Sequence, residues 1–287
     1  ILDGKNPLAV CIVGASVTMF VVFYLAHGIN VRSSTALVGT LASLLVTGIP
    51  ASWATSASRL TGKGTEEAIG ALPELREIDL SDNRLRELPA AVGRLFRLEE
   101  LALSGNGLRR LPAELAGLPL LRTLRLARND LTDLPDVVPA LDQLEVLDLS
   151  GNQLAELPDV FDGLPRLEWL WLNDNPLTGA PHSLGRLTRL RFLHLGGTPM
   201  AEPPPRVFEI TSLEELWLGS PSLRRLPPDI ARLSRLRELD VSYAELTELP
   251  GELFEMRTLR VLRIEGNPLP EDTASRLRTA LPDCQVY

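Results

Sequence analysis

Aromatic side chains at a regular spacing are the residues of this sequence whose types most clearly suggest chemistry. Trp169 and Trp171 are followed 23 residues later by Phe192 and His194, and Trp217 follows His194 after another 23 residues. Aromatic rings gathered on one surface favour binding, because they bury a large area with few rotatable bonds and are frequent hot-spot residues. The pattern therefore predicts molecular recognition at these positions.

Carboxylates and a tyrosine accompany the rings. Glu215 and Asp240 occupy the equivalent positions of the following units, and Tyr243 comes three residues after Asp240. A carboxylate rim around an aromatic surface predicts a protein or peptide partner that has a basic rim of its own. The alternative is that the rings pack only on one another and shield the backbone beneath them.

Residue types that carry catalysis are sparse and poorly spaced. The three histidines, His27, His182 and His194, have neither a nucleophile nor a metal ligand at a useful interval. Cys11 and Cys284 stand near opposite ends of the chain, which gives no disulfide framework and no zinc spacing. We therefore expect a protein that is not an enzyme and that uses no metal and no cofactor.

A leucine frame with a period of 23 residues positions these side chains. It reads Leu-x-x-Leu-x-Leu-x-x-Asn-x-Leu and runs without insertion or deletion through nine copies. A short fixed period predicts a solenoid, in which each unit buries its apolar face only against its neighbours. We expect an α/β fold in which one short strand per unit joins a curved parallel sheet on the concave face. The copies begin at Leu75, Leu98, Leu121, Leu144, Leu167, Leu190, Leu213, Leu236 and Leu259.

Alternation along each strand decides which side chains reach the surface. Because successive side chains point to opposite faces, the leucines enter the core and the third and fifth frame positions line the concave face. Neighbouring strands lie about 4.8 Å apart, so rings on consecutive strands form one patch. These positions hold Trp169, Trp171, Phe192, His194, Glu215, Trp217 and Asp240.

Asparagine recurs at the ninth frame position, where the strand gives way to a turn. Its side-chain amide can pair with turn backbone groups that no neighbouring strand reaches, so we expect a stacked structural ladder. The ladder residues are Asn83, Asn106, Asn129, Asn152, Asn175 and Asn267. Beside the aromatic positions the ladder is interrupted by Thr198, Pro221 and Ala244.

The frame and the Leu-Pro pair that follows it, as at 88–89 and 111–112, resemble the leucine-rich repeat family in its 23-residue LPxx form. The resemblance implies the solenoid fold and a role in recognition. It does not name the partner, because proteins with this fold bind molecules of many unrelated kinds.

Two stretches near the N-terminus lack charged residues. Residues 8–26 and 35–54 are each long enough to cross a hydrocarbon core of about 30 Å as a helix. We expect two transmembrane helices, and two buried soluble helices are the alternative. Because the chain starts with Ile1, we expect a fragment or a processed product, whereas the ending at Tyr287 resembles a family terminal cap.

The segments YLAHGINVRSSTALVGTL, from Tyr24 to Leu41, and LTGKGTEEA, from Leu60 to Ala68, resemble the YibE/F-like bacterial membrane proteins. The resemblance covers roughly residues 5–70 and implies a multi-pass membrane protein, sometimes proposed as a transporter. With two spans before the repeats, no complete transport pathway can be carried over. A genuine fusion, a truncated record and a misjoined reading frame all stay open.

The distribution of charged residues limits the class of partner and predicts the orientation of the chain in the membrane. The formal net charge is −8, and residues 1–71 contribute +1, which leaves −9 on residues 72–287. An acidic repeat region disfavours nucleic acid as a ligand. Lys5, Arg59 and Lys63 flank the outer ends of the two spans, against Arg32 between them, so we expect the repeats in the cytoplasm.

These patterns predict four regions: a membrane segment at 1–64, a half-repeat cap at 65–74, nine repeats at 75–270 and a C-terminal cap at 271–287. The function hypothesis is a monomeric, membrane-tethered scaffold that binds a protein or peptide on the concave face. A regulatory repeat domain on a YibE/F-like transport component and an outward-facing sensor ectodomain are the alternatives.

Overall fold

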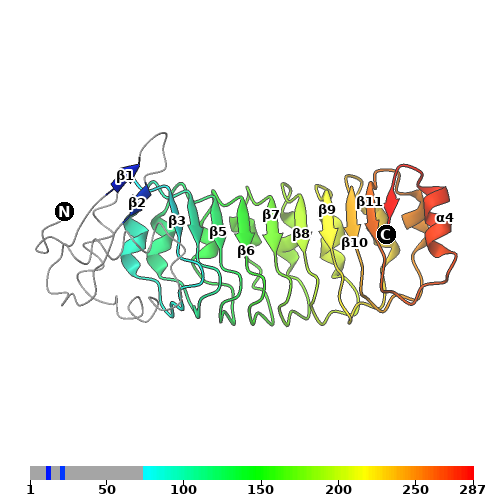
Figure 1. Ribbon diagram of the computed structural model, residues 1–287, viewed down its shortest axis with the longest axis horizontal. Helices are drawn as coiled ribbons and strands as arrows, with labels where there is room; N and C mark the ends of the chain where they lie inside the picture. Colours follow the sequence, from blue (N-terminus) through cyan, green and yellow to red (C-terminus); the bar gives the residue numbers. More distant parts are fainter. Residues whose placement is uncertain (1–10, 14–19, 23–73) are drawn as a thin grey trace, which may run out of the picture. The chain divides into compact units, whose positions relative to one another are not determined.

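The computed structural model describes residues 11–13, 20–22 and 74–287 (Figure 1). The chain divides into two compact units. The first holds the described residues up to Asp130 together with Pro135–Leu141, and the second holds Leu131–Leu134 and Asp142–Tyr287. Both units are built from the same repeated element, a short strand followed by a 3₁₀ helix.

The first unit contains three parallel strands whose partners lie 23 residues apart in sequence. They are β3 (Glu77–Asp79), β4 (Glu100–Ala102) and β5 (Thr123–Arg125). The 3₁₀ helices are η1 (Ala90–Arg94), η2 (Ala113–Gly117) and η3 (Val138–Ala140). A separate antiparallel pair joins β1 (Cys11–Val13) to β2 (Phe20–Val22).

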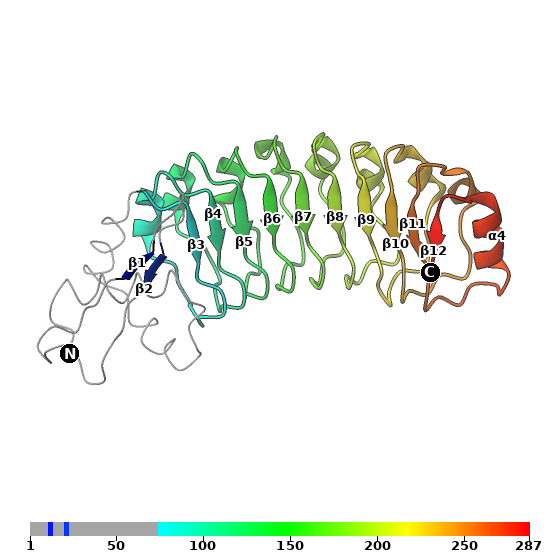
Figure 2. The same ribbon diagram turned by 45° about the horizontal axis from the view of Figure 1, so that its top comes forward.

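The second unit carries seven parallel strands, which follow one another side by side in chain order (Figures 1 and 2). They are β6 (Val146–Asp148), β7 (Trp169–Trp171), β8 (Phe192–His194), β9 (Glu215–Trp217), β10 (Glu238–Asp240), β11 (Val261–Arg263) and β12 (Gln285–Val286). The 3₁₀ helices are η4 (Phe161–Gly163), η5 (His182–Arg186), η6 (Pro205–Glu209), η7 (Pro228–Arg232) and η8 (Gly251–Glu255). One α-helix, α4 (Thr273–Ala280), lies at the C-terminal end beside β12.

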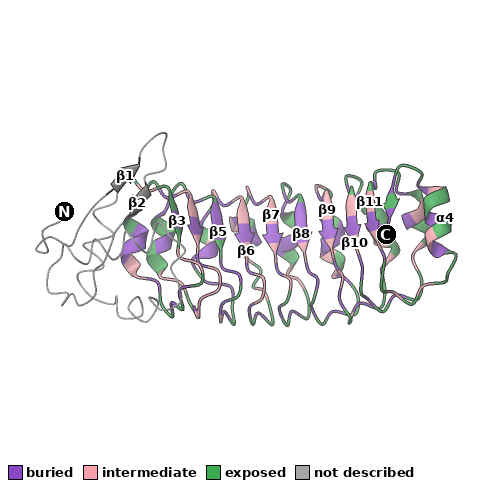
Figure 3. Cartoon of the chain, in the orientation of Figure 1, coloured by how far each residue is buried: buried purple, intermediate pink, exposed green. Residues whose placement is uncertain are grey.

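The leucines of the frame form the core of each unit. Leu147, Leu170 and Leu193, at the centres of three consecutive strands, are fully buried. The strand residues beside them are partly accessible except Phe192, and Figure 3 shows buried and intermediate residues together along these strands. Burying each leucine side chain contributes about 1.5–3 kcal/mol, which the short strands could not obtain without neighbours. The expected parallel sheet of a leucine-rich repeat is confirmed.

Proline starts most of the return segments. Pro89 and Pro112 precede η1 and η2 with φ of −60° and −69°, values that the proline ring enforces. At the end of η1, the backbone N–H of Leu95 donates to the carbonyl of Val92. Each return segment therefore carries a 3₁₀ helix of three to five residues, which fits the 23-residue repeat.

Ladder asparagines connect consecutive repeats. Oδ1 of Asn106 accepts the N–H groups of Asn83 at 3.1 Å and Leu85 at 2.8 Å, and its Nδ2 donates to the carbonyls of Leu80 and Leu103, each at 2.9 Å. One amide thereby pairs four turn groups. The side chains of Asn129, Asn175 and Asn267 bond across two repeats in the same way.

Threonine and serine supply part of this bonding where asparagine is missing. Thr198 Oγ1 donates to the carbonyl of Leu195 at 2.8 Å, as an asparagine amide does three residues back. Ser220 Oγ then donates to the carbonyl of Thr198 at 2.6 Å. The turn beside the aromatic strands thus keeps a reduced set of hydrogen bonds.

The N-terminal expectations lie mostly outside the described residues. This holds for all of the predicted span 35–54 and for span 8–26 except residues 11–13 and 20–22. Those six residues form β1 and β2 where the sequence led us to expect a helix, and all of them except Cys11 are β-branched or aromatic types, which favour extended backbone. In the part of the chain that the structure describes, no helix is long and apolar enough to span a bilayer.

Candidate binding surface on the sheet

Two rows of side chains cross the outward face of strands β6 to β11, and we call this the exposed sheet face. The rows follow from the parallel register, which aligns the third frame positions with one another and likewise the fifth. The third-position row runs Val146, Trp169, Phe192, Glu215, Glu238, Val261. The fifth-position row runs Asp148, Trp171, His194, Trp217, Asp240, Arg263.

Five rings on β7, β8 and β9 touch one another. We call Trp169, Trp171, Phe192, His194 and Trp217 the aromatic cluster. Ring centroids of Trp169 and Trp171 lie 6.0 Å apart and stack at 16°. The Phe192 centroid lies 4.8 Å from that of Trp171 and 5.4 Å from those of Trp169 and Trp217. The structure therefore brings together all five rings that the repeat spacing aligned.

Phe192 is the covered centre of the cluster. It is only 3% exposed although it stands on the outward face, whereas Trp169, Trp171 and Trp217 keep part of their surface accessible. A phenylalanine between larger rings gains burial, and the indoles above it become the outer layer. The rings thus pack on one another and also present an accessible aromatic surface.

Small residues make room for the imidazole of His194. A Cβ placed on Gly196 would lie 2.8 Å from His194 Nε2 and 2.9 Å from the carbonyl oxygen of Gly219, both too close. At Gly197, whose φ is +68°, a Cβ would lie 2.3 Å from Asp174 Oδ1. His194 and Asp174 therefore lean over glycine backbone beside the cluster, and the repeat pattern alone did not reveal this.

Burial and surrounding charge act in opposite directions on His194. Desolvation lowers the pKa of this imidazole, while the carboxylates of Asp174, Asp240 and Asp148 oppose that shift. The pKa of Glu215 is raised by burial and by the nearby carboxylates of Glu238 and Glu214. The cluster is thus a partly desolvated surface with an excess of negative charge.

Arginine neutralises only part of this charge. Arg263 forms a salt bridge with Glu238, and hydrogen bonding to that carboxylate raises the pKa of Arg263. In the described residues, no salt bridge within 4.0 Å engages Asp148, Asp174, Glu215 or Asp240. Sequence reasoning included Glu215 and Asp240 in the rim and missed Asp148, although the frame aligns Asp148 with Trp171.

Tyr243 lies in the turn that follows β10, and in the described part of the chain it makes no ring contact with the aromatic cluster. It is 70% exposed with a left-handed φ of 50°, an uncommon conformation for a bulky side chain. A Cβ on Gly266 would lie 2.7 Å from Tyr243 Cδ1, so the tyrosine ring lies over the turn of the next repeat. The sequence placed Tyr243 at the edge of the patch, and its part in binding stays a prediction.

One buried polar atom of the cluster has no partner. The indole Nε1 of Trp217 is buried and forms no hydrogen bond within the described residues. Unsatisfied buried donors are costly and uncommon in folded proteins. Sequence spacing gives no signal for this feature, because the position of Nε1 depends on the side-chain rotamer.

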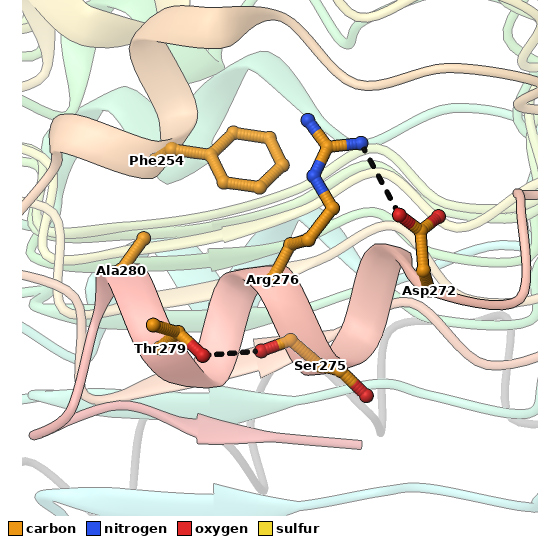
Figure 4. Close-up of a pocket in the computed structure, with 6 residues that line it drawn as sticks. All are labelled: Phe254, Asp272, Ser275, Arg276, Thr279 and Ala280. Atoms are coloured by element: carbon orange, nitrogen blue, oxygen red, sulfur yellow. Dashed lines mark hydrogen bonds and ion pairs between the residues drawn. The ribbon is translucent and has the colours of Figure 1, made fainter.

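A pocket lies at the C-terminal end of the chain (Figure 4). It lies between α4 and η8, and the Arg276 guanidinium stands 5.4 Å from the centroid of the Phe254 ring that lines it. Asp272 pairs with Arg276 at 3.8 Å, and Thr279 Oγ1 donates to the Ser275 carbonyl at 3.0 Å. These groups satisfy one another, so the aromatic cluster is the stronger candidate for binding.

The repeated strands, 3₁₀ turns and asparagine bonds define a leucine-rich repeat domain. The family model described as leucine rich repeat matches residues 73–131 and 119–177, which confirms the resemblance. The model described as YibE/F-like protein matches residues 1–82 and confirms the second resemblance. The chain is therefore similar to leucine-rich repeat proteins over residues 73–177 and to YibE/F-like proteins over residues 1–82.

Solved structures share this fold. A leucine-rich repeat protein of Leptospira interrogans is 32% identical with a TM-score of 0.72, over 77% of this chain and 56% of that one. An internalin of Listeria monocytogenes is 16% identical with a TM-score of 0.62, over 83% and 73%. The ectodomain of an Arabidopsis thaliana membrane receptor kinase, solved with CASPARIAN STRIP INTEGRITY FACTOR 2, is 24% identical with a TM-score of 0.56, over 76% and 30%.

Two of these matches are partial in length. The chain spans 56% of the Leptospira protein and 30% of the receptor ectodomain. The comparison with curated proteins found no match.

Proposed function

We propose that this protein binds a protein or peptide on the exposed sheet face of its repeats, through the aromatic cluster. The observation that carries the proposal is the contiguous set of partly accessible tryptophan rings on three consecutive strands. Large aromatic patches of this kind usually mark binding sites. The receptor ectodomain with the same fold, solved with a bound factor, supports a role in recognition.

The partner carries positive charge at the edge of its contact. Glu215 and Asp240 border the rings, and neither forms a salt bridge within the described residues. A basic partner would gain attraction from these groups, and an acidic partner would be repelled.

The proposal also includes a membrane anchor in the N-terminal segment, which would hold the repeats in the cytoplasm. Its support is the absence of charge in residues 8–26 and 35–54 and the YibE/F-like match over residues 1–82. The same match favours a second candidate, a regulatory repeat domain on a membrane transport component. The third arrangement, an outward-facing sensor, differs in topology alone.

Selection from a displayed library of random peptides tests the binding proposal on the full chain. Enriched peptides are then measured against the double variant Trp171→Ala, Trp217→Ala. Phe96→Ala is the matched control, because Phe96 is also an exposed aromatic (59%) and lies on the first unit. Loss of binding in the double variant alone supports the proposal, and equal binding by all three proteins overturns it.

Protease treatment of intact cells tests the topology. An immunoblot against the C-terminal repeats is expected to show a full-length band in the membrane fraction that is protected until lysis. Cleavage in intact cells would instead support the sensor arrangement, and a soluble product would overturn the anchor.

A further inference from the structure

We infer that the bound segment is an extended, dibasic peptide that lies across the strands. Its two basic side chains would meet Asp148 and Asp240, and an apolar stretch between them would cover Trp171, His194 and Trp217. This inference rests on the proposed function and specifies the ligand of the same surface.

The fifth-position row sets the geometry. Asp148 on β6 and Asp240 on β10 flank the three rings Trp171, His194 and Trp217, and Arg263 on β11 follows Asp240. Four strand spacings of about 4.8 Å separate the two aspartates by about 19 Å. An extended peptide rises about 3.3 Å per residue, so basic residues roughly five to seven positions apart match this distance.

Turn contacts hold both aspartates in place. Asp148 Oδ1 accepts the N–H of Ser150 at 3.0 Å and its hydroxyl at 2.7 Å. Asp240 Oδ1 accepts the same two groups of Ser242 at 2.9 and 2.6 Å. Carboxylates that are already oriented lose less freedom when a cation binds.

Charge on the surrounding face favours a basic ligand over others. Asp174, which accepts a hydrogen bond from Asn173 at 2.7 Å, adds a third carboxylate near His194. The cation of the row, Arg263, is engaged by Glu238 and lies 5.9 Å from the Tyr287 ring centroid. A phosphate or an acidic peptide would therefore meet repulsion along most of the row.

Tryptophan rings strengthen the same preference. A guanidinium or ammonium within about 6 Å of an indole face is attracted by the ring quadrupole. Trp171 and Trp217 flank His194 in the fifth-position row. A basic side chain that reaches either aspartate would therefore pass close to an indole. Aliphatic or aromatic residues in the middle of the peptide would cover the remaining ring surface.

The test uses the full chain and a displayed library of random twelve-residue peptides. Enriched sequences should carry two arginines or lysines five to seven residues apart with apolar residues between them. Their affinity should fall about 10-fold or more in Asp148→Asn and in Asp240→Asn, because each change removes a charge-assisted contact. The fall should be larger at low salt than at high salt.

Asp79→Asn provides a matched control. Asp79 occupies the same frame position on β3, and its Oδ1 accepts the N–H of Ser81 at 2.9 Å, but its row neighbour is Ala102 instead of tryptophan. If Asp148→Asn and Asp240→Asn bind as Asp79→Asn does, while Trp171→Ala abolishes binding, the dibasic inference is overturned and the proposed function stands. Enrichment of neutral or acidic peptides would also overturn the dibasic inference. Peptides that bind independently of the tryptophans would overturn both.

Discussion

The ring of Phe192 lies 4.8 Å, between centroids, from the ring of Trp171 on the neighbouring strand. The phenylalanine is buried on the outward face of the sheet while the tryptophan remains partly accessible. The two side chains therefore have different structural roles. Phe192 supports the surface that Trp171 presents, so mutations can separate stability from binding.

Phe192→Ala is expected to destabilise the repeats by about 2–4 kcal/mol, because it leaves a void beneath the indoles. Trp171→Ala should cost less, since Trp171 is partly accessible to solvent. Urea denaturation of both variants measures the difference in free energy of unfolding. Equal stability of the two variants would show that Phe192 does not support the cluster.

Asn175→Ala is expected to cost about 2–4 kcal/mol, because several buried backbone groups lose their partner at once. Asn175 Oδ1 accepts the N–H of Leu154 at 3.1 Å, and its Nδ2 donates to the carbonyls of Leu149 and Leu172. Asn173→Ala is the control, because its amide donates to the exposed Asp174 carboxylate. A similar cost for both variants would argue against the ladder.

Gly196→Ala is expected to destabilise by about 1–3 kcal/mol, because the new methyl group would meet His194 Nε2 and the Gly219 carbonyl. Gly179→Ala is the counterpart, with nothing within 4 Å of its added Cβ, and it should be neutral or slightly stabilising. Thermal unfolding compares the two. A stable Gly196→Ala protein would mean that the imidazole can move aside without cost.

Stability should decrease as the pH falls below about 6.5, and His194 should account for part of the decrease. Burial lowers the pKa of His194 in the folded state below the 6.5 of an unperturbed imidazole, so the unfolded chain binds a proton first. The stabilising effect of the neutral imidazole is present above pH 6.5 and is lost as the pH falls toward the lower, folded-state pKa. Asp148, Asp174 and Asp240 reduce the effect without reversing it.

His194→Gln is expected to flatten the change in urea midpoint between pH 7.5 and 5.5. Glu215 has the opposite effect on the free energy of unfolding. Because its pKa is raised in the folded state, its stabilising contribution is present below pH 4.5 and is lost as the pH rises through the folded-state pKa. An unchanged slope in His194→Gln would contradict the assignment to this imidazole.

Much of the fold followed from the leucine frame, because a strict period fixes which side chains alternate into the core. Leu170 and its counterparts are buried as the frame required, and Trp169 and Trp171 face outward on one strand. Strand direction and register then align His194 with both Trp171 and Trp217. These features depend on backbone geometry, which the repeat determines.

Side-chain rotamers and turn conformations did not follow from the frame. Alternation puts Phe192 on the outward face, but its burial depends on how the neighbouring indoles fold over it. The left-handed φ of Tyr243 and the position of its ring over Gly266 likewise depend on the turn and not on the frame. The glycines beneath His194 carry no hydrophobic signal, so their role emerged only from distances.

Tryptophan fluorescence tests the binding account most directly. Three of the four tryptophans belong to the aromatic cluster, and the fourth, Trp53, lies outside the described residues. Titration of the full chain with an enriched peptide should shift the emission in step with binding measured by the anisotropy of the labelled peptide. The Trp171→Ala, Trp217→Ala protein should lose both signals while Phe96→Ala keeps them. Binding by anisotropy that leaves the emission unchanged would place the ligand elsewhere and contradict the account.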